Sequence, residues 1–136
     1  MEVEDRNREI VRALYRATGR GNWTDAAALM TEDVLIIEPS SLPFAGTYRG
    51  VEAMRKLFEK VVRSAGVIGA ERKQITAGGD WVVVLHDLLL EGPPPVRAPM
   101  AEAFRLRDGK VCEIVPYYFD HRLITAAAEA RDHGLD

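Results

Sequence analysis

Two glutamates lie on strand faces that are otherwise apolar, and their positions favour acid–base chemistry. In the strand predicted for residues 97–106, Glu102 shares its face with the apolar residues Ala98, Met100, Phe104 and Leu106. Glu38 ends the β-branched run 33–38, again on an apolar face. Because a buried carboxylate is costly unless it is paired or protonated, two such groups facing one cavity would suit general acid–base catalysis. The alternatives for Glu102 are a structural salt bridge or a face that opens to solvent, and the alternative for Glu38 is a solvated strand end.

The strand predicted for residues 81–90 is apolar on both faces, and it carries His86 next to Asp87. Since successive side chains of a strand point to opposite faces, one of these two faces the interior, and the sequence does not decide which. His86 is therefore either an acid or base of the site or a hydrogen-bonded core histidine. A strand with two apolar faces must be covered on both, which predicts helices on one face and a second copy of the chain on the other.

Asp120 closes the last predicted strand, just before the C-terminal helix. An aspartate at this position favours a helix-capping role, and catalysis is the alternative. Aromatic and flexible apolar residues are numerous enough to line a substrate pocket, although such residues are as often plain core. The residues that we assign to the pocket wall are Tyr15, Trp23, Phe44, Tyr48, Phe58, Met100 and Tyr118.

Other kinds of site find no support in the sequence. The histidines His86, His121 and His133 lack metal-ligand spacing, and no phosphate-binding lysine motif is present, so we expect neither a metal nor a cofactor. A single cysteine, Cys112, excludes an internal disulfide. The net charge of 18 − 21 = −3 argues against a nucleic-acid partner.

Signals for membranes and secretion are also missing from the sequence. The longest apolar run, residues 81–85, is far too short to span a bilayer. The N-terminus is acidic and polar, without the basic and apolar regions of a signal peptide. We therefore expect a cytoplasmic protein with no membrane partner.

The order of the predicted elements indicates an α+β fold. Helical spacing predicts helices over 4–19, 23–30, 50–65 and 121–132, and alternation or β-branched runs predict strands over 33–38, 67–77, 81–90, 97–106 and 110–119. Residues 40–49 are predicted as a loop. Gly78-Gly79-Asp80 and Asp108-Gly109 are typical of tight turns, so the later strands form an antiparallel meander. Helices set apart from antiparallel strands, with no linker, predict a single α+β domain over residues 1–136.

Several stretches of the chain resemble the SnoaL-like branch of the nuclear transport factor 2/ketosteroid isomerase superfamily. Asn22–Val34 is similar to that family's second helix and first strand, and Glu38–Pro39 with Leu42–Gly50 to its loop into the third helix. Phe104–Val111 is similar to the terminal hairpin, and Pro116–Asp120 to the last strand and the start of the closing helix. The resemblance implies a cone: a curved mixed or antiparallel sheet of cystatin-like architecture, wrapped by the N-terminal helices around a deep pocket. It also implies a homodimer formed through the sheet.

The resemblance further implies roles for single residues. Glu38 matches the carboxylate base of the ketosteroid isomerase branch, and Glu102 matches its protonated acid. The first-helix tyrosine of that branch aligns one residue before Tyr15. In the cyclase branch, the acid–base aspartate and its histidine correspond to Asp120 and His86.

Members of this superfamily include isomerases, cyclases, epoxide hydrolases, dehydratases and binding proteins, so the fold leaves several functions open. We expect a cofactor-free acid–base enzyme of isomerase or polyketide-cyclase type, acting on a small hydrophobic carbonyl compound. Glu38 would take a proton next to the carbonyl, Glu102 would hydrogen-bond the developing enolate oxygen, and His86 would be the reserve acid or base. The alternatives are a non-catalytic ligand-binding protein, a dimerising interaction module and an epoxide hydrolase.

Overall fold

Six strands form one curved, mixed sheet in the computed structural model, which describes residues 2–134. The order of the strands across the sheet is β2-β1-β6-β5-β4-β3. Strands β1 and β6 are parallel, and all other neighbouring strands are antiparallel. In chain order the elements are α1 (Val3–Gly19), α2 (Trp23–Ala28), β1 (Met30–Glu38), β2 (Gly46–Arg49), α3 (Val51–Ala65), β3 (Val67–Gly78), β4 (Trp81–Leu90), β5 (Val96–Arg107), β6 (Lys110–Tyr118) and α4 (His121–Gly134).

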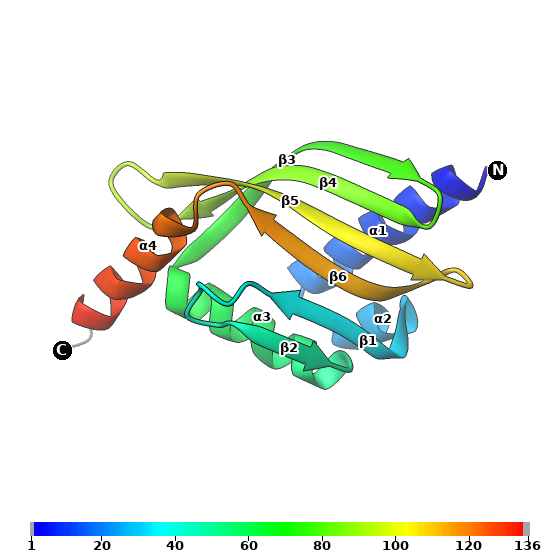
Figure 1. Cartoon of the computed structure of the whole chain (residues 1–136), viewed down its shortest axis with the longest axis horizontal. Coiled ribbons are helices and arrows are strands. Elements are labelled where there is room, and N and C mark those ends of the chain that lie inside the picture. The colour runs from blue at the N-terminus through cyan, green and yellow to red at the C-terminus, as the bar shows by residue number, and fades with distance from the viewer. Residues whose placement is uncertain (1, 135–136) are drawn as a thin grey trace.

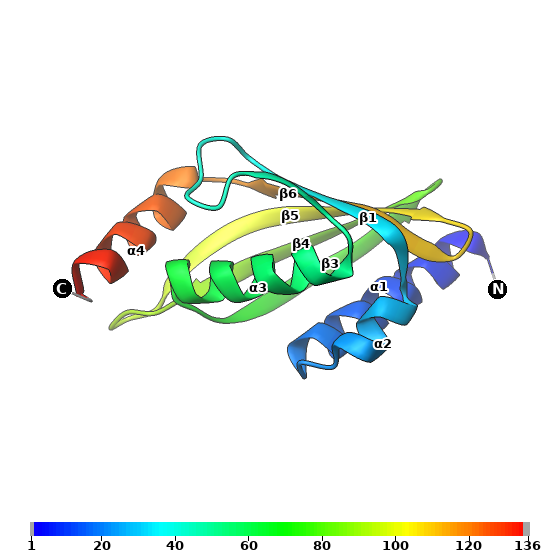
Figure 2. The ribbon, with the colours of Figure 1, turned by 90° about the horizontal axis from the view of Figure 1, so that it is seen from below.

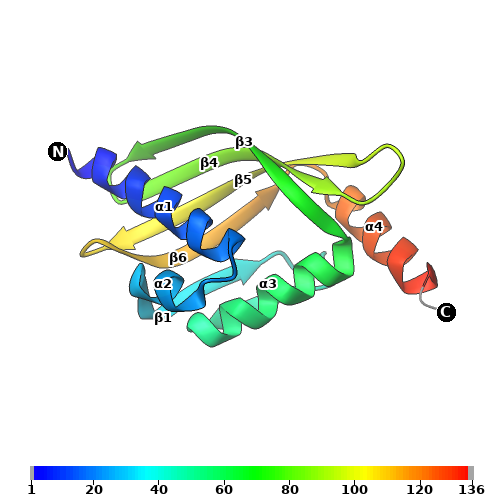
Figure 3. The ribbon, with the colours of Figure 1, turned by 180° about the vertical axis from the view of Figure 1, so that it is seen from behind.

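Helices α1, α2 and α3 lie against one face of the sheet, and α4 projects from one end of it (Figures 2 and 3). The opposite face of the sheet carries none of the described helices (Figure 1). This arrangement confirms the predicted α+β fold, with N-terminal helices wrapping a curved mixed sheet. None of the helices within residues 2–134 is long and apolar enough to cross a membrane.

The buried core lies between the sheet and the helices that cover it. Alternate residues of β4 and β5 supply its inner layer, because successive strand side chains point to opposite faces. The largest fully buried side chains are Phe44, Met30, Leu90, Ile124, Val11, Val34, Val82, Val84 and Val111. The sheet is therefore anchored to its helical cover over most of its length, and only part of the inner face remains to line a cavity.

Turns and caps adopt the geometry that their local sequences predict. Asp108 and Gly109 have positive φ angles of 52° and 77°, as a two-residue type I′ hairpin turn requires. The side chain of Asn22 accepts a hydrogen bond from the backbone N–H of Asp25 at 3.1 Å and caps α2. The predicted turn is confirmed, and both the turn and the cap depend only on conformations and hydrogen bonds within a few residues of the chain.

The region around the first strand differs from the prediction in two places. Residues 40–49 were predicted as a loop, but Gly46–Arg49 forms the edge strand β2, which pairs with β1. A strand of four residues shows too little alternation to be recognised in a sequence. Met30, predicted as the end of a helix, instead begins β1 three residues before Asp33, because its side chain is buried and its backbone pairs with Val111.

Asp120 provides a test of local helix stability. Its Oδ1 accepts a hydrogen bond from the backbone N–H of Arg122 at 3.0 Å, at the first turn of α4. We expect Asp120→Ala to lower the free energy of unfolding by about 1 kcal/mol, because the amide loses its acceptor, whereas Asp120→Asn keeps the cap. Urea denaturation of both variants measures this difference. An equal loss in both would show that the Asp120 charge, which also pairs with Arg122, matters instead of the cap.

Candidate functional site

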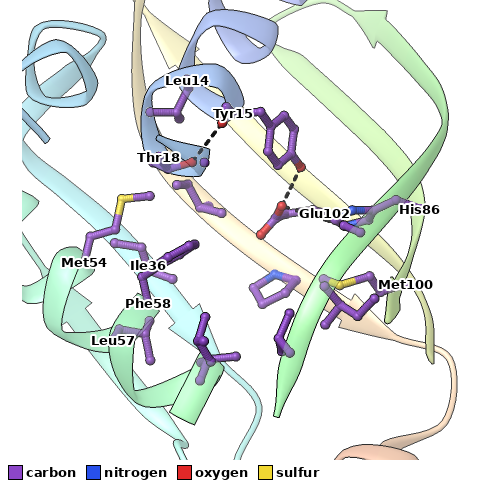
Figure 4. Close-up of a pocket in the computed structure, with 18 of the residues that line it drawn as sticks. Leu14, Tyr15, Thr18, Ile36, Met54, Leu57, Phe58, His86, Met100 and Glu102 are labelled. Atoms are coloured by element: carbon purple, nitrogen blue, oxygen red, sulfur yellow. Dashed lines mark hydrogen bonds and ion pairs between the residues drawn. The ribbon is translucent and has the colours of Figure 1, made fainter. Parts of the chain in front are cut away.

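A cavity of about 330 Å³ lies between the inner face of the sheet and helices α1 and α3. Its wall is mostly apolar, and Figure 4 shows Met54, Leu57 and Phe58 of α3 facing the sheet across it. Few polar side chains reach it, and among these are two carboxyl groups, a histidine and two tyrosines. Concave, mostly apolar pockets with a few convergent polar groups are the usual sites of small-molecule binding.

The sheet register places the polar side chains of the cavity in one region. Arg72 pairs with His86, His86 with Met100, and Met100 with Tyr118, so the four form a row across β3, β4, β5 and β6. All four line the cavity. Glu102 lies two residues along β5 from Met100 and therefore points to the same face. Residues from four strands thus meet because each occupies the inner face of its own strand.

The same register decides which of His86 and Asp87 faces inward. His86 lines the cavity, whereas Asp87 points to the opposite face of the sheet. There the Asp87 carboxylate lies 3.2 Å from Lys73 Nζ and 3.3 Å from a guanidinium nitrogen of Arg97. Both His86 and Asp87 are buried, but only His86 belongs to the site.

Glu102 occupies the centre of the polar group. The Tyr15 hydroxyl, from α1, donates a hydrogen bond to Glu102 Oε1 at 2.5 Å, and Figure 4 shows this contact beside His86. His86 Nε2 lies 3.9 Å from the same oxygen. Burial raises the pKa of Glu102, and the hydrogen bond from Tyr15 opposes that rise. Burial, followed by the charge of Glu102, raises the pKa of Tyr15, so its hydroxyl stays a hydrogen-bond donor.

Glu38, at the end of β1, is the second carboxyl group of the cavity. The Tyr118 hydroxyl donates a hydrogen bond to Glu38 Oε1 at 3.3 Å. Burial raises the pKa of Glu38 from its ordinary 4.5 to about 7, with a further contribution from the charge of Glu102 and a smaller opposing one from Tyr118. The charge of Glu102 thus disfavours ionisation of Glu38, so a proton on either carboxyl group favours ionisation of the other.

His86 contributes a neutral imidazole. Burial, and then the positive charge of Arg72, lower the pKa of His86 to about 4, against an opposing contribution from Asp87. Both of its ring nitrogens are buried, and within residues 2–134 neither has a hydrogen-bond partner. A neutral imidazole offers one donor and one acceptor, and leaving either unpaired in the interior is unfavourable. His86 is therefore suited to hydrogen-bond a polar group of a molecule bound in the cavity.

Four residues expected at the site lie outside the cavity. Phe44 is fully buried in the core. Tyr48 donates a hydrogen bond to the Phe44 carbonyl oxygen at 2.7 Å, which stabilises the loop before β2. Trp23 packs edge-to-face on Phe58, with 5.6 Å between ring centroids. Asp120 caps α4. The other expected residues, Glu38, Glu102, His86, Tyr15, Phe58, Met100 and Tyr118, line the cavity.

Arg72 lines the cavity although the sequence analysis did not single it out. The pairing of β3 with β4 shifts between Arg72 and Gln74, which marks a β-bulge. Ile75 faces inward, and strict alternation from Ile75 back along β3 would put Arg72 on the outer face. Alternation therefore assigns Arg72 to the wrong face. The position of a bulge depends on the partner strand, and the alternation within β3 alone does not reveal it.

Comparisons with known proteins agree with this fold. Residues 11–114 match the family described as SnoaL-like domain. A nuclear transport factor 2-like protein from Burkholderia xenovorans is 25% identical over 92% of this chain and 97% of that chain, with a TM-score of 0.78. A putative SnoaL-like polyketide cyclase from a Jannaschia species is 22% identical over 94% and 95% of the two chains, with a TM-score of 0.76. TerC, co-crystallised with polyporic acid, is 18% identical over 91% and 98% of the two chains, also with a TM-score of 0.76. None of the curated proteins matches the chain.

The raised pKa of Glu38 predicts a pH-dependent cost to stability. Since its pKa is about 7 in the fold and ordinarily 4.5, the folded state binds the proton more tightly, and stability falls as pH rises from 4.5 to 7. Glu38→Gln lacks this titration. We expect the variant to gain stability relative to the wild type across that window, by on the order of 3 kcal/mol at most.

Urea denaturation at several pH values measures this difference. Glu113→Gln, which removes a carboxyl group from the opposite face of the sheet, is the matched control. A constant difference between Glu38→Gln and the wild type from pH 4.5 to 8 would contradict the raised pKa of Glu38.

Proposed function

The chain belongs to the SnoaL-like domain family, and from this premise and the geometry of the cavity we propose that it is a cofactor-free acid–base enzyme. Its substrate would be a small hydrophobic carbonyl compound, and its reaction an isomerisation or an aldol-type cyclisation. The observation that carries the proposal is that Glu38 and Glu102 share one mostly apolar cavity. Burial raises the pKa of both, which is how a carboxyl group becomes an effective acid or base at neutral pH.

Glu38 is the proposed base. The charge of Glu102 contributes to the raised pKa of Glu38, so a proton on one carboxyl group favours ionisation of the other. With that proton on Glu102, the ionised Glu38 removes a proton from the carbon next to the substrate carbonyl. A base whose pKa lies near the working pH is the most effective, and the pKa of Glu38 is about 7.

Glu102 and Tyr15 form the proposed binding site for the carbonyl oxygen. Tyr15 donates its hydrogen bond to Glu102 Oε1, so a proton on the other carboxyl oxygen is available to the substrate. As Glu38 takes the substrate proton, negative charge moves to the carbonyl oxygen, and the hydrogen bond from Glu102 strengthens. The enolate then takes the proton back from Glu38 at another carbon of the conjugated system. In the alternative reaction it attacks a second carbonyl group to close a ring, and the alkoxide so formed takes the proton from Glu38.

His86 is the proposed second contact to the substrate. Its ring lies beside Glu102 and has no hydrogen-bond partner within residues 2–134. Because its pKa is lowered to about 4, it acts at neutral pH as an uncharged donor or acceptor. One similar structure is named as a putative polyketide cyclase, and another, TerC, was co-crystallised with polyporic acid. Both support a role with small organic molecules.

Exchange of substrate protons with deuterium tests the proposal without knowledge of the natural substrate. In D₂O, the enzyme should accelerate exchange at the carbon next to the carbonyl of 2-tetralone, 2-indanone or 1-acetonaphthone. The loss of the ¹H NMR signal of that carbon measures the rate of exchange. Glu38→Gln should lower the rate by about 100-fold or more, because the base is lost. Glu102→Gln should retain more activity, because a glutamine side chain still donates a hydrogen bond.

The two variants also test the assignment of roles. If Glu102→Gln were inactive and Glu38→Gln active, the base and the donor would be reversed. Glu113→Gln, which lies outside the cavity, should exchange protons at the wild-type rate. Absence of protein-dependent exchange in all three ketones would contradict the catalytic proposal and favour the ligand-binding alternative.

We also propose that two copies of the chain pair through the outer face of the sheet. Leu85, Ala101 and Tyr117 pair in register across β4, β5 and β6 and form an apolar row on that face. Leu85 is 45% and Tyr117 61% exposed, and the nearby Phe119 is 85% exposed. Exposed apolar surface of this kind is typical of an interaction surface.

Ion pairs border the apolar row on both sides. Arg105 lies 3.8 Å from Glu113 towards one end of β5, and Arg97 lies 2.8 Å from Glu71 and 3.3 Å from Asp87 towards the other. An apolar centre with a rim of both charge signs is typical of protein interfaces. Because each end carries both signs, the face is complementary to itself, which favours a second copy of this chain as the partner.

The dimer is tested by the mass of the particle in solution. Light scattering should give twice the 15.1 kDa of one chain for the wild type. Leu85→Arg places a charge in the centre of the apolar row and should give the monomer, while its exposed position leaves the core intact. A monomeric wild type, or a dimer that Leu85→Arg does not weaken, would contradict this interface.

A further inference from the structure

We infer that the cavity selects substrates that carry an anionic group, a carboxylate or a similar anion, and that Arg72 binds this group at the cavity mouth. The inference deepens the proposed function, on which it rests for the carbonyl group at the inner end of the substrate. The outer end of the substrate is assigned from the position and environment of Arg72 alone.

The mouth of the cavity is marked by the residues of its wall that solvent reaches. Most lining residues are buried or half-buried, and those that are exposed are Gly19, Phe58, Ala70 and Arg72. They come from the end of α1, from α3 and from β3, so the opening lies among these three elements. Glu38 and His86, which are 7% and 4% exposed, lie at the inner end. A bound molecule therefore has one end near the carboxyl groups and the other near Arg72.

The β-bulge in β3 keeps Arg72 on the inner face at this mouth. Arg72 pairs with His86, but the register shifts before Gln74, which pairs with the outward-facing Leu85. The intervening Lys73 reaches Asp87 on the outer face. The bulge thus separates two cations, turning one to the outer face and leaving the other at the cavity.

The guanidinium of Arg72 is held in place but not neutralised. Its Cζ lies 4.9 Å from the centre of the Tyr15 ring, a cation–π contact that fixes its position. Other arginines on the sheet, such as Arg97 and Arg105, form ion pairs with carboxylates. Within residues 2–134, Arg72 forms no ion pair, and it is the one lysine or arginine that lines the cavity. Its planar set of N–H donors is therefore available to a carboxylate of a ligand.

The charges of the cavity set the orientation of such a ligand. Ionised carboxyl groups at the inner end repel an anion, whereas Arg72 attracts it to the mouth. The Tyr15 side chain connects the two ends, since Arg72 lies over its ring and Glu102 accepts a hydrogen bond from its hydroxyl group. The anion of the ligand would thus lie towards Arg72 and its carbonyl oxygen towards Glu102, on either side of the Tyr15 side chain. The substrate class that fits is a ring-containing keto acid.

Two dyes that differ by one anionic group test this inference by binding alone. The probes are 1-anilinonaphthalene-8-sulfonate and its neutral parent N-phenyl-1-naphthylamine, titrated against the full chain by fluorescence. We expect Arg72→Gln to weaken binding of the sulfonate roughly fivefold or more and to leave the neutral dye unchanged, because only the sulfonate pairs with the guanidinium. Arg72→Lys, which keeps the charge but not the planar donors, should be intermediate.

Controls in the same chain locate the bound dye. Arg105→Gln makes the same charge change on the outer face and should alter neither affinity. In protein labelled at the methionine methyl groups, both dyes should shift the NMR signals of Met54 and Met100, which line the cavity, and not that of Met30 in the core.

Several results would overturn the inference. These are an equal effect of Arg72→Gln on both dyes, no effect on the sulfonate, or binding that leaves the signals of Met54 and Met100 unchanged. The proposed catalysis fails separately, since the exchange assay uses neutral ketones that carry no group for Arg72. Loss of ketone exchange with retained preference for the sulfonate would reject the enzyme and keep the anion site.

Discussion

The removal of two carboxyl groups from water is the constraint on which the site depends. Glu38 and Glu102 are held in a mostly apolar cavity, and burial is the largest cause of the raised pKa of each. A carboxyl group in such a place needs a hydrogen-bond donor, and Tyr118 and Tyr15 each supply one from a different element. The charge of Glu102 also raises the pKa of Glu38, so a proton on one carboxyl group favours ionisation of the other, as acid–base chemistry at neutral pH requires.

Side chains alternate between the two faces of the curved sheet, and this alternation brings the polar groups of the site together on the inner face. Cross-strand pairing puts Arg72, His86, Met100 and Tyr118 in one row, with Glu102 on the same face. Helices α1 and α3 close the space above that face, and α1 brings Tyr15 to Glu102. The cost of the buried polar groups is offset by the apolar core, whose fully buried side chains lie elsewhere between the sheet and its helices.

The two faces of the sheet have separate physical characters. The inner face holds the polar groups of the cavity, while the outer face has an exposed apolar row bordered by ion pairs of both signs. Adjacent residues of one strand, His86 and Asp87, belong to different environments for this reason. At the bulge after Arg72, the side chains of β3 no longer alternate strictly between the two faces, and the guanidinium of Arg72 stays at the mouth of the cavity.

The sequence by itself determined what is local: the helix and strand periods, the Asp108-Gly109 turn and the inner face of β5, because each is encoded within one element. It also placed Glu102 and Glu38 on apolar faces, yet alternation says nothing about which cavity a face lines. Only the tertiary structure decided that His86 points inward, that Phe44 fills the core, and that Arg72 reaches the mouth. These outcomes depend on strand register, on a bulge and on packing between elements distant in the chain, and no short segment of sequence contains that information.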